Sequence, residues 1–184
     1  MEIFRPTRDG GATARIDSAE AALLRDLISQ VMGMIAGSRP PLPLRESPVD
    51  ALADIFDPDA SVEIPEDPVL ARLLPDAYPD DPDAAKEFRR YTESSLRNTK
   101  RESAQILLDT LPVRGGKIKL SGDQARAWLR ALNDVRLTFG TRLNVTEDYE
   151  DQLIGLNPED PAAAAFEVYG WLGAVQSSLV QALM

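Results

Sequence analysis

The residue types that most often carry catalysis or bind metals are unevenly represented in this chain. Its 184 residues include no His and no Cys, so the commonest metal ligand, the usual general base and any thiol nucleophile are missing. Carboxylates remain, in two acidic runs: Asp80, Asp81 and Asp83, and Glu147, Asp148, Glu150 and Asp151. Oxygen ligands suit Mg²⁺ or Ca²⁺, but neither run has EF-hand spacing, and acidic runs are usually solvated loops. We therefore predict no catalytic residue, no metal and no cofactor. A carboxylate metal-dependent enzyme is the third and most remote hypothesis.

A second group of residues with chemical potential is cationic. The stretch "EFRRYTESSLRNTKRE", residues 87–102, falls within a predicted helix over 82–111. At about 100° per residue, its cations and the preceding lysine share roughly a third of the helix circumference. We call this group the basic stripe: Lys86, Arg89, Arg90, Arg97, Lys100 and Arg101. Phe88 and Tyr91 lie on the opposite side, which predicts that the stripe faces outward and the aromatic side chains face the core.

Several roles of the basic stripe remain open at this stage. The first alternative is that the basic stripe is simply solvated, and the second is that it pairs with acidic residues of the same chain. The third is that it contacts a protein partner, and the fourth is that it binds nucleic-acid phosphates. Internal pairing is plausible because residues 43–85 hold twelve acidic residues against two arginines, which matches the net charge of −10 of the whole chain. No element that reads base edges is evident, so sequence-specific DNA recognition is not predicted.

Turn and capping signals indicate which elements position these residues. Asp9-Gly10-Gly11 predicts a hairpin of strands 2–6 and 12–16, and residues 117–120 are expected to add a third strand. Asp17 with Glu20, and Ser121 with Gln124, form capping-box patterns. The first pattern begins a helix that ends near residue 36, and the second begins another amphipathic helix.

A Ser-Pro or Asp-Pro pair begins each of the remaining predicted helices, because Pro at the first helical position has no amide proton to lose. These helices span 48–56, 68–74, 82–111 and 161–183. We therefore predict a mainly α single domain over 1–184, with about five or six helices and a small antiparallel sheet of two or three strands. The acidic, Pro-rich segment 43–85 has the character of an insertion.

The last predicted helix is unusually apolar. Residues 168–184 carry no charge, but the run is shorter than the roughly 20 apolar residues of a membrane span. We expect helix 161–183 to lie in the core or to form a homodimer interface, with no membrane contact. The N-terminus has no apolar signal core, so a cytoplasmic location is predicted.

Several stretches resemble one family: "DPVLARLLPDAYPDDPDAAKEFRRYTESSLRNTK", "ARAWLRALNDVRLTFGTRLNVTEDYE" and "AAAFEVYGWLGAVQSSLV". The resemblance is to an actinobacterial family of formerly unknown function that is associated with the oxidative-stress regulator AosR. It implies a non-enzymatic regulatory protein that affects transcription through protein–protein contacts, with a sigma factor or another transcription component as partner. DNA is the alternative partner, which would make the chain a nucleic-acid-binding module that uses the basic stripe. A thiol switch cannot operate in this chain, because it has no Cys.

The most specific part of the resemblance is the pattern "LNDVRL…GTRL". Its polar and small residues, which we call the signature, are Asn133, Asp134, Arg136, Gly140, Thr141 and Arg142. Asn and Asp inside an apolar helix compete with the backbone for hydrogen bonds. Two interpretations follow: a polar contact site at a partner surface, or a buried network in which Asp134 pairs with Arg130 or Arg142.

Overall fold

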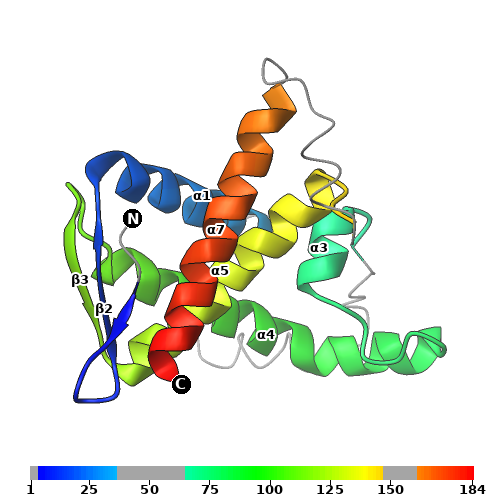
Figure 1. The fold of residues 1–184 in the computed structure, drawn as a ribbon. Coiled ribbons are helices and arrows are strands. Elements are labelled where there is room, and N and C mark those ends of the chain that lie inside the picture. Colours follow the sequence, from blue (N-terminus) through cyan, green and yellow to red (C-terminus); the bar gives the residue numbers. More distant parts are fainter. Residues whose placement is uncertain (1–3, 37–64, 147–160) are drawn as a thin grey trace, which may run out of the picture.

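The computed structural model describes residues 4–36, 65–146 and 161–184, and these residues form a mainly helical molecule (Figure 1). The described elements are β1 (Arg5–Pro6), β2 (Ala12–Ile16), α1 (Ser18–Ala36), α3 (Pro68–Leu73), α4 (Pro82–Thr110), β3 (Gly116–Leu120), α5 (Gly122–Arg142) and α7 (Pro161–Leu183). The predicted fold class is confirmed, with five helices and three strands in the described parts. The helix predicted over 48–56 and the acidic run from Glu147 to Asp151 lie outside the described residues.

The three strands form one antiparallel sheet in the order β1-β2-β3. In its centre Ala14 lies opposite Ile118. The β1–β2 turn places Gly10 at φ 75°, a conformation that glycine adopts without steric cost. Strand β1 pairs with β2 at Arg5 and Pro6, within the predicted range 2–6, of which residues 2 and 3 lie outside the described residues.

The helices begin at the capping residues that the sequence predicts. Asp17 accepts the Glu20 amide at 2.8 Å and Glu20 accepts the Asp17 amide at 3.1 Å. Ser121 and Gln124 make the same reciprocal pair at the start of α5. Asp67 and Asp81 cap α3 and α4, each followed by a proline.

Helix α5 occupies the centre of the core, where it packs against α1, α3, α4 and α7. Its fully buried Trp128 meets Phe4 edge-on, with ring centroids 5.9 Å apart. The indole Nε1 of Trp128 donates to Thr110 Oγ1 at the end of α4, at 2.7 Å. This contact joins α4 and α5 and so fixes where the residues of the basic stripe lie relative to the signature.

Helix α7 crosses α5 and reaches the sheet (Figure 1). Leu172 and Leu179 of α7 are fully buried in the main hydrophobic cluster, which confirms the prediction of a core role for the C-terminal helix. No described helix combines the length and apolar character that crossing a membrane requires. A homodimer through α7 stays a prediction.

Candidate functional site

Arg89 of the basic stripe is buried, with only 5% of its surface exposed. Its guanidinium donates to Asp76 Oδ1 at 2.5 Å and to Glu93 Oε2 at 2.7 Å, and it also reaches the Leu74 carbonyl. Desolvation alone would lower the pKa of Arg89, but the hydrogen bonds and charges of Glu93 and Asp76 outweigh it and raise the pKa. Arg89 is therefore a structural cation that ties α4 to the turn after α3.

Two more cations of the basic stripe are also used inside the molecule. Arg97 donates to Glu93 Oε1 at 2.8 Å and to the carbonyl of Ile35 at the end of α1. Lys100 pairs with Asp134 of α5 at 2.6 Å, and the two side chains are only 15% and 6% exposed. Helix α4 is thus joined to α1 and to α5 by charged contacts.

The outward orientation predicted for the basic stripe is therefore wrong for Arg89, Arg97 and Lys100. It is also wrong for the aromatic side chains, because Phe88 is 44% and Tyr91 63% exposed. The physical reason is that oppositely charged neighbours compensate the inward cations. The alternative of pairing with the acidic segment 43–85 is confirmed at one contact, Arg89 with Asp76. Lys86, Arg90 and Arg101 are exposed, and their role as partner contacts stays a prediction.

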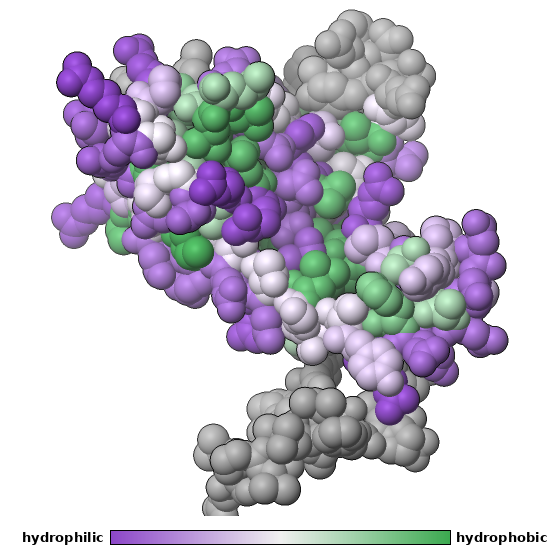
Figure 2. All heavy atoms as spheres, turned by 90° about the horizontal axis from the view of Figure 1, so that it is seen from below, coloured by the Kyte–Doolittle hydropathy of each residue, from purple (hydrophilic) through white to green (hydrophobic). Residues whose placement is uncertain are grey.

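The reversed orientation leaves an apolar patch near the start of α4. Of the seven large apolar side chains that are exposed in the described residues, four lie here. We define the apolar patch as Tyr78, Phe88, Tyr91 and Leu96. Tyr78 meets Phe88 edge-on at 5.7 Å between ring centroids, and Arg90 lies 5.9 Å from the centre of the Tyr91 ring. Figure 2 shows apolar side chains among charged ones at the end of the molecule where Figure 1 places the first half of α4.

A groove of about 260 Å³ runs beside the apolar patch. Leu74, Pro75 and Ala77 form one wall, and Phe88 and Leu96 of α4 form the other. Arg89 and Glu93, which are paired with each other, also line it. The groove offers apolar walls with fixed charges that are already neutralised, which suits an apolar side chain of another protein.

Asp134 of the signature lies in a buried network, as one of the two interpretations predicted, but its partner is Lys100 and neither Arg130 nor Arg142. Arg130 donates to Ser103 Oγ at 3.0 Å, and Arg142 pairs with Asp67 at 2.9 Å. Burial raises the pKa of Asp134, although the hydrogen bond and charge of Lys100 lower it. Sequence spacing within α5 could not reveal this partner, because it comes from another helix.

Four of the other five signature residues lie together at a different place. Asn133, Arg136, Gly140 and Thr141 line a cleft of about 880 Å³ between α3, α5 and α7, which we call the signature cleft. Residues of α3 and the turn that follows it form the facing wall. The signature therefore divides into a structural carboxylate that pairs with α4, four residues that line the cleft, and Arg142, which pairs with Asp67.

Arg136 is the principal cation of the signature cleft. It is half-buried, donates to Gln176 Oε1 at 2.8 Å and to the Tyr169 hydroxyl at 3.4 Å, and lies 5.2 Å from the centre of the Tyr169 ring. Its Nε is buried without a hydrogen-bond partner. Gln176 and Tyr169 are both neutral, and among the described residues no carboxylate forms an ion pair with Arg136.

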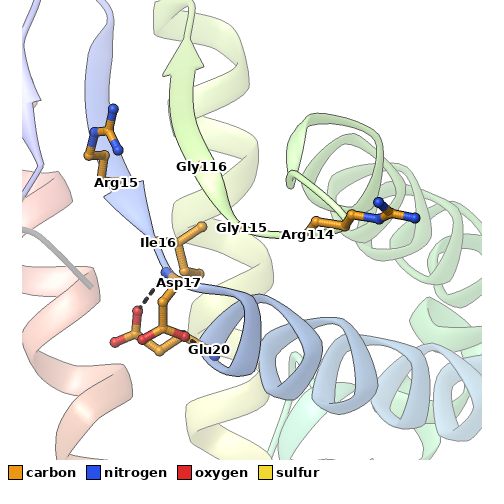
Figure 3. Close-up of a pocket in the computed structure, with 7 residues that line it drawn as sticks. All are labelled: Arg15, Ile16, Asp17, Glu20, Arg114, Gly115 and Gly116. Atoms are coloured by element: carbon orange, nitrogen blue, oxygen red, sulfur yellow. Dashed lines mark hydrogen bonds between the residues drawn. The ribbon is translucent and has the colours of Figure 1, made fainter.

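A shallow hollow also lies where β2 meets α1 (Figure 3). Its two carboxylates, Asp17 and Glu20, take part in the helix cap, and its two arginines, Arg15 and Arg114, lie well apart on either side. The acidic residues Asp80, Asp81 and Asp83 are exposed, and Asp81 caps α4. No group of three or more potential metal ligands gathers in the described parts of the chain.

Comparisons with known proteins place these features in a wider context. The model of a family described as a domain of unknown function, DUF2017, matches residues 1–183. A Mycobacterium tuberculosis (strain ATCC 25618 / H37Rv) protein named oxidative stress regulator AosR is 36% identical over 193 residues, covering 97% of this chain and 85% of the relative. A Mycobacterium bovis protein of the same name matches to the same extent. No solved structure was found to match.

Proposed function

The chain belongs to the DUF2017 family, and we propose that it is a regulatory protein that acts without catalysis, by binding a protein of the transcription apparatus such as a sigma factor. The relatives named oxidative stress regulators support the regulatory part of this proposal. The apolar patch on α4 supports the protein-binding part and is the observation that carries it. Exposed aromatic side chains beside a groove are typical of protein interfaces.

The inward cations favour a protein partner over DNA. Arg89, Arg97 and Lys100 are held in ion pairs inside the chain. The exposed members of the basic stripe are Lys86, Arg90 and Arg101. Acidic Asp83 and Glu87 are exposed nearby, which further weakens attraction for phosphates. Binding through the apolar patch should therefore depend on burial of apolar surface more than on charge.

The test uses the purified chain and the sigma factors of its native organism, each alone and with core RNA polymerase. We expect one of them to bind, and binding to survive 0.3 M salt, chosen because roughly 0.1 M already screens exposed charges beyond about 10 Å. Tyr91→Ser with Phe88→Ser should reduce the affinity by about tenfold or more, because truncating buried aromatic side chains at interfaces costs more than 1 kcal/mol each. Val113→Ser is the matched control, since Val113 is 75% exposed but lies after α4.

Binding that is unchanged in the doubly substituted variant would contradict the apolar patch as the contact surface. The DNA alternative is tested separately by binding to promoter fragments. It predicts an affinity that falls steeply with salt and is lost when Lys86, Arg90 and Arg101 become Ala. Replacing Arg89 or Arg97 is unsuitable for this purpose, because either change removes contacts within the fold.

A further inference from the structure

The signature cleft has the dimensions and lining of a ligand site. Its volume of about 880 Å³ lies within the range of roughly 300–1,000 Å³ of small-molecule sites. Pro68 and Ala71 of α3 face Leu137 of α5 and Val145 across it, and Asn133 and Thr141 add hydrogen-bonding groups. Half of the fourteen lining residues are polar or charged, so the cleft offers an apolar surface together with groups that can fix a polar end of a small organic molecule.

The charge of the signature cleft selects the kind of ligand. Arg136 and Arg72 line it, and Asp76, the acidic residue of its lining, is already paired with Arg89. Arg136 is half-buried and stacked on Tyr169, and its hydrogen-bond partners among the described residues are the neutral Gln176 and Tyr169. A partly desolvated guanidinium that forms no ion pair with any described residue favours an anion, and its planar donors match a carboxylate.

The position of Arg136 within α5 argues against a more highly charged ligand. Helix α5 ends at Arg142, so Arg136, Gly140 and Thr141 lie in its last two turns, where the helix dipole is negative. That end of a helix disfavours a phosphate dianion and supplies no free amide groups to bind one. A single negative charge placed against the guanidinium fits both constraints.

We propose that the signature cleft binds a small organic carboxylate with an apolar body, whose carboxylate is held by Arg136 while its body lies between α3 and α5. The signature cleft shares Pro75 and Asp76 with the groove beside the apolar patch, but Arg136 and the other α5 residues line the cleft alone. The proposed carboxylate binding does not require that the apolar patch binds a protein. Helices α5 and α7 would hold the guanidinium in place, since a Cβ added to Gly173 would lie only 3.8 Å from the guanidinium carbon.

The test is a titration of the isotope-labelled chain with benzoate, indole-3-acetate and octanoate, followed by amide and arginine Nε–H resonances. We expect saturable shifts centred on Asn133, Arg136 and Thr141 for at least one of the acids at millimolar concentration. Its neutral amide, for example benzamide for benzoate, should bind at least about tenfold more weakly, because a charge-assisted hydrogen bond is lost. Inorganic phosphate should produce no comparable shifts.

Two variants and one control separate binding from folding. Arg136→Gln should weaken the carboxylate at least about tenfold and remove the preference over the amide. Arg126→Gln is the matched control, because this arginine lies on the same helix but is 61% exposed and pairs with Asp123. Ala71→Leu narrows the cleft from α3 while leaving Arg136 in place, so it should also weaken binding even if Arg136→Gln fails to fold.

Three results would overturn the proposal. They are the absence of shifts with all three acids, equal affinity for acid and amide, and shifts that persist unchanged in both Arg136→Gln and Ala71→Leu. Phosphate that binds as tightly as the acids would overturn the assignment to a carboxylate. Melting temperatures of each variant establish that the comparison is made on folded protein.

Discussion

Replacing Lys100 with Met should destabilise the protein strongly. The Lys100–Asp134 pair spans 2.6 Å between α4 and α5, with side chains only 15% and 6% exposed. Removing one member of a buried pair leaves the other charge uncompensated, at a cost of about 3–5 kcal/mol. Lys100 retains some exposure, so we expect the lower end, about 3 kcal/mol, which is roughly 100-fold in the unfolding equilibrium.

The stability lost in Lys100→Met should be larger at neutral pH than at acidic pH. Burial raises the pKa of Asp134 above its ordinary value, against the opposing effect of Lys100. A carboxyl with a raised folded-state pKa contributes stability that is present below its unfolded pKa and lost as pH rises through the folded one. Without Lys100 the pKa rises further. The deficit of Lys100→Met should therefore be largest at pH 7 and shrink as pH falls toward about 4.

Urea unfolding of the wild type and variant at pH 7 and at a lower pH measures both effects, with the midpoint compared at constant slope. Arg101→Met is the matched control, because Arg101 is exposed and should change stability by less than about 0.5 kcal/mol. Adding Asp134→Asn to Lys100→Met should restore part of the loss at pH 7, since no charge remains buried. The reasoning would be refuted if Lys100→Met lost no more unfolding free energy than Arg101→Met, or if its loss grew as pH falls.

Four further substitutions test other features of the fold. Gly115→Ala should destabilise by more than about 1 kcal/mol in thermal unfolding, because φ is 73° and a Cβ would lie 2.6 Å from a backbone carbon; Gly33→Ala, in open space within α1, should instead stabilise by about 0.5–1 kcal/mol. Trp128→Phe removes the hydrogen bond to Thr110 and should cost at least about 1 kcal/mol, read from the urea midpoint. If α7 forms a homodimer, sedimentation of the wild type should show a dimer that Val180→Arg abolishes, since Val180 is 42% exposed; a monomeric wild type would reject that prediction.

Local signals predicted much of the fold because the physics that they report is itself local. The caps at Asp17, Asp81 and Ser121 each satisfy a nearby amide, and no distant residue is needed to make them favourable. The sheet followed from local signals as well: β2 spans the predicted 12–16, and β3 begins one residue before the predicted 117–120.

The orientation of α4 could not be inferred from the assumption that charged side chains face the solvent. Its buried Ala104 and Leu107 lie on one face, and steps of three or four residues toward the N-terminus lead to Lys100, Arg97 and Arg89. The apolar residues at the end of α4 were therefore the signal that identified which face of the helix lies inward. The partners that make it favourable, Asp76 and Asp134, come from other elements and carry no local mark.

The contact between Phe4 and Ser178 has a consequence for synthesis. The Phe4 amide donates to the Ser178 hydroxyl at 3.4 Å, so the first described residue is held by the last helix. A ribosome releases the N-terminal strand long before α7 emerges, and during that interval Phe4 and the edge of β1 lack their cover. Final closure of the core must then wait until α7 has left the ribosome, and until then the nascent chain is exposed to aggregation. Truncating α7 should consequently lower the soluble yield before any regulatory contact is affected.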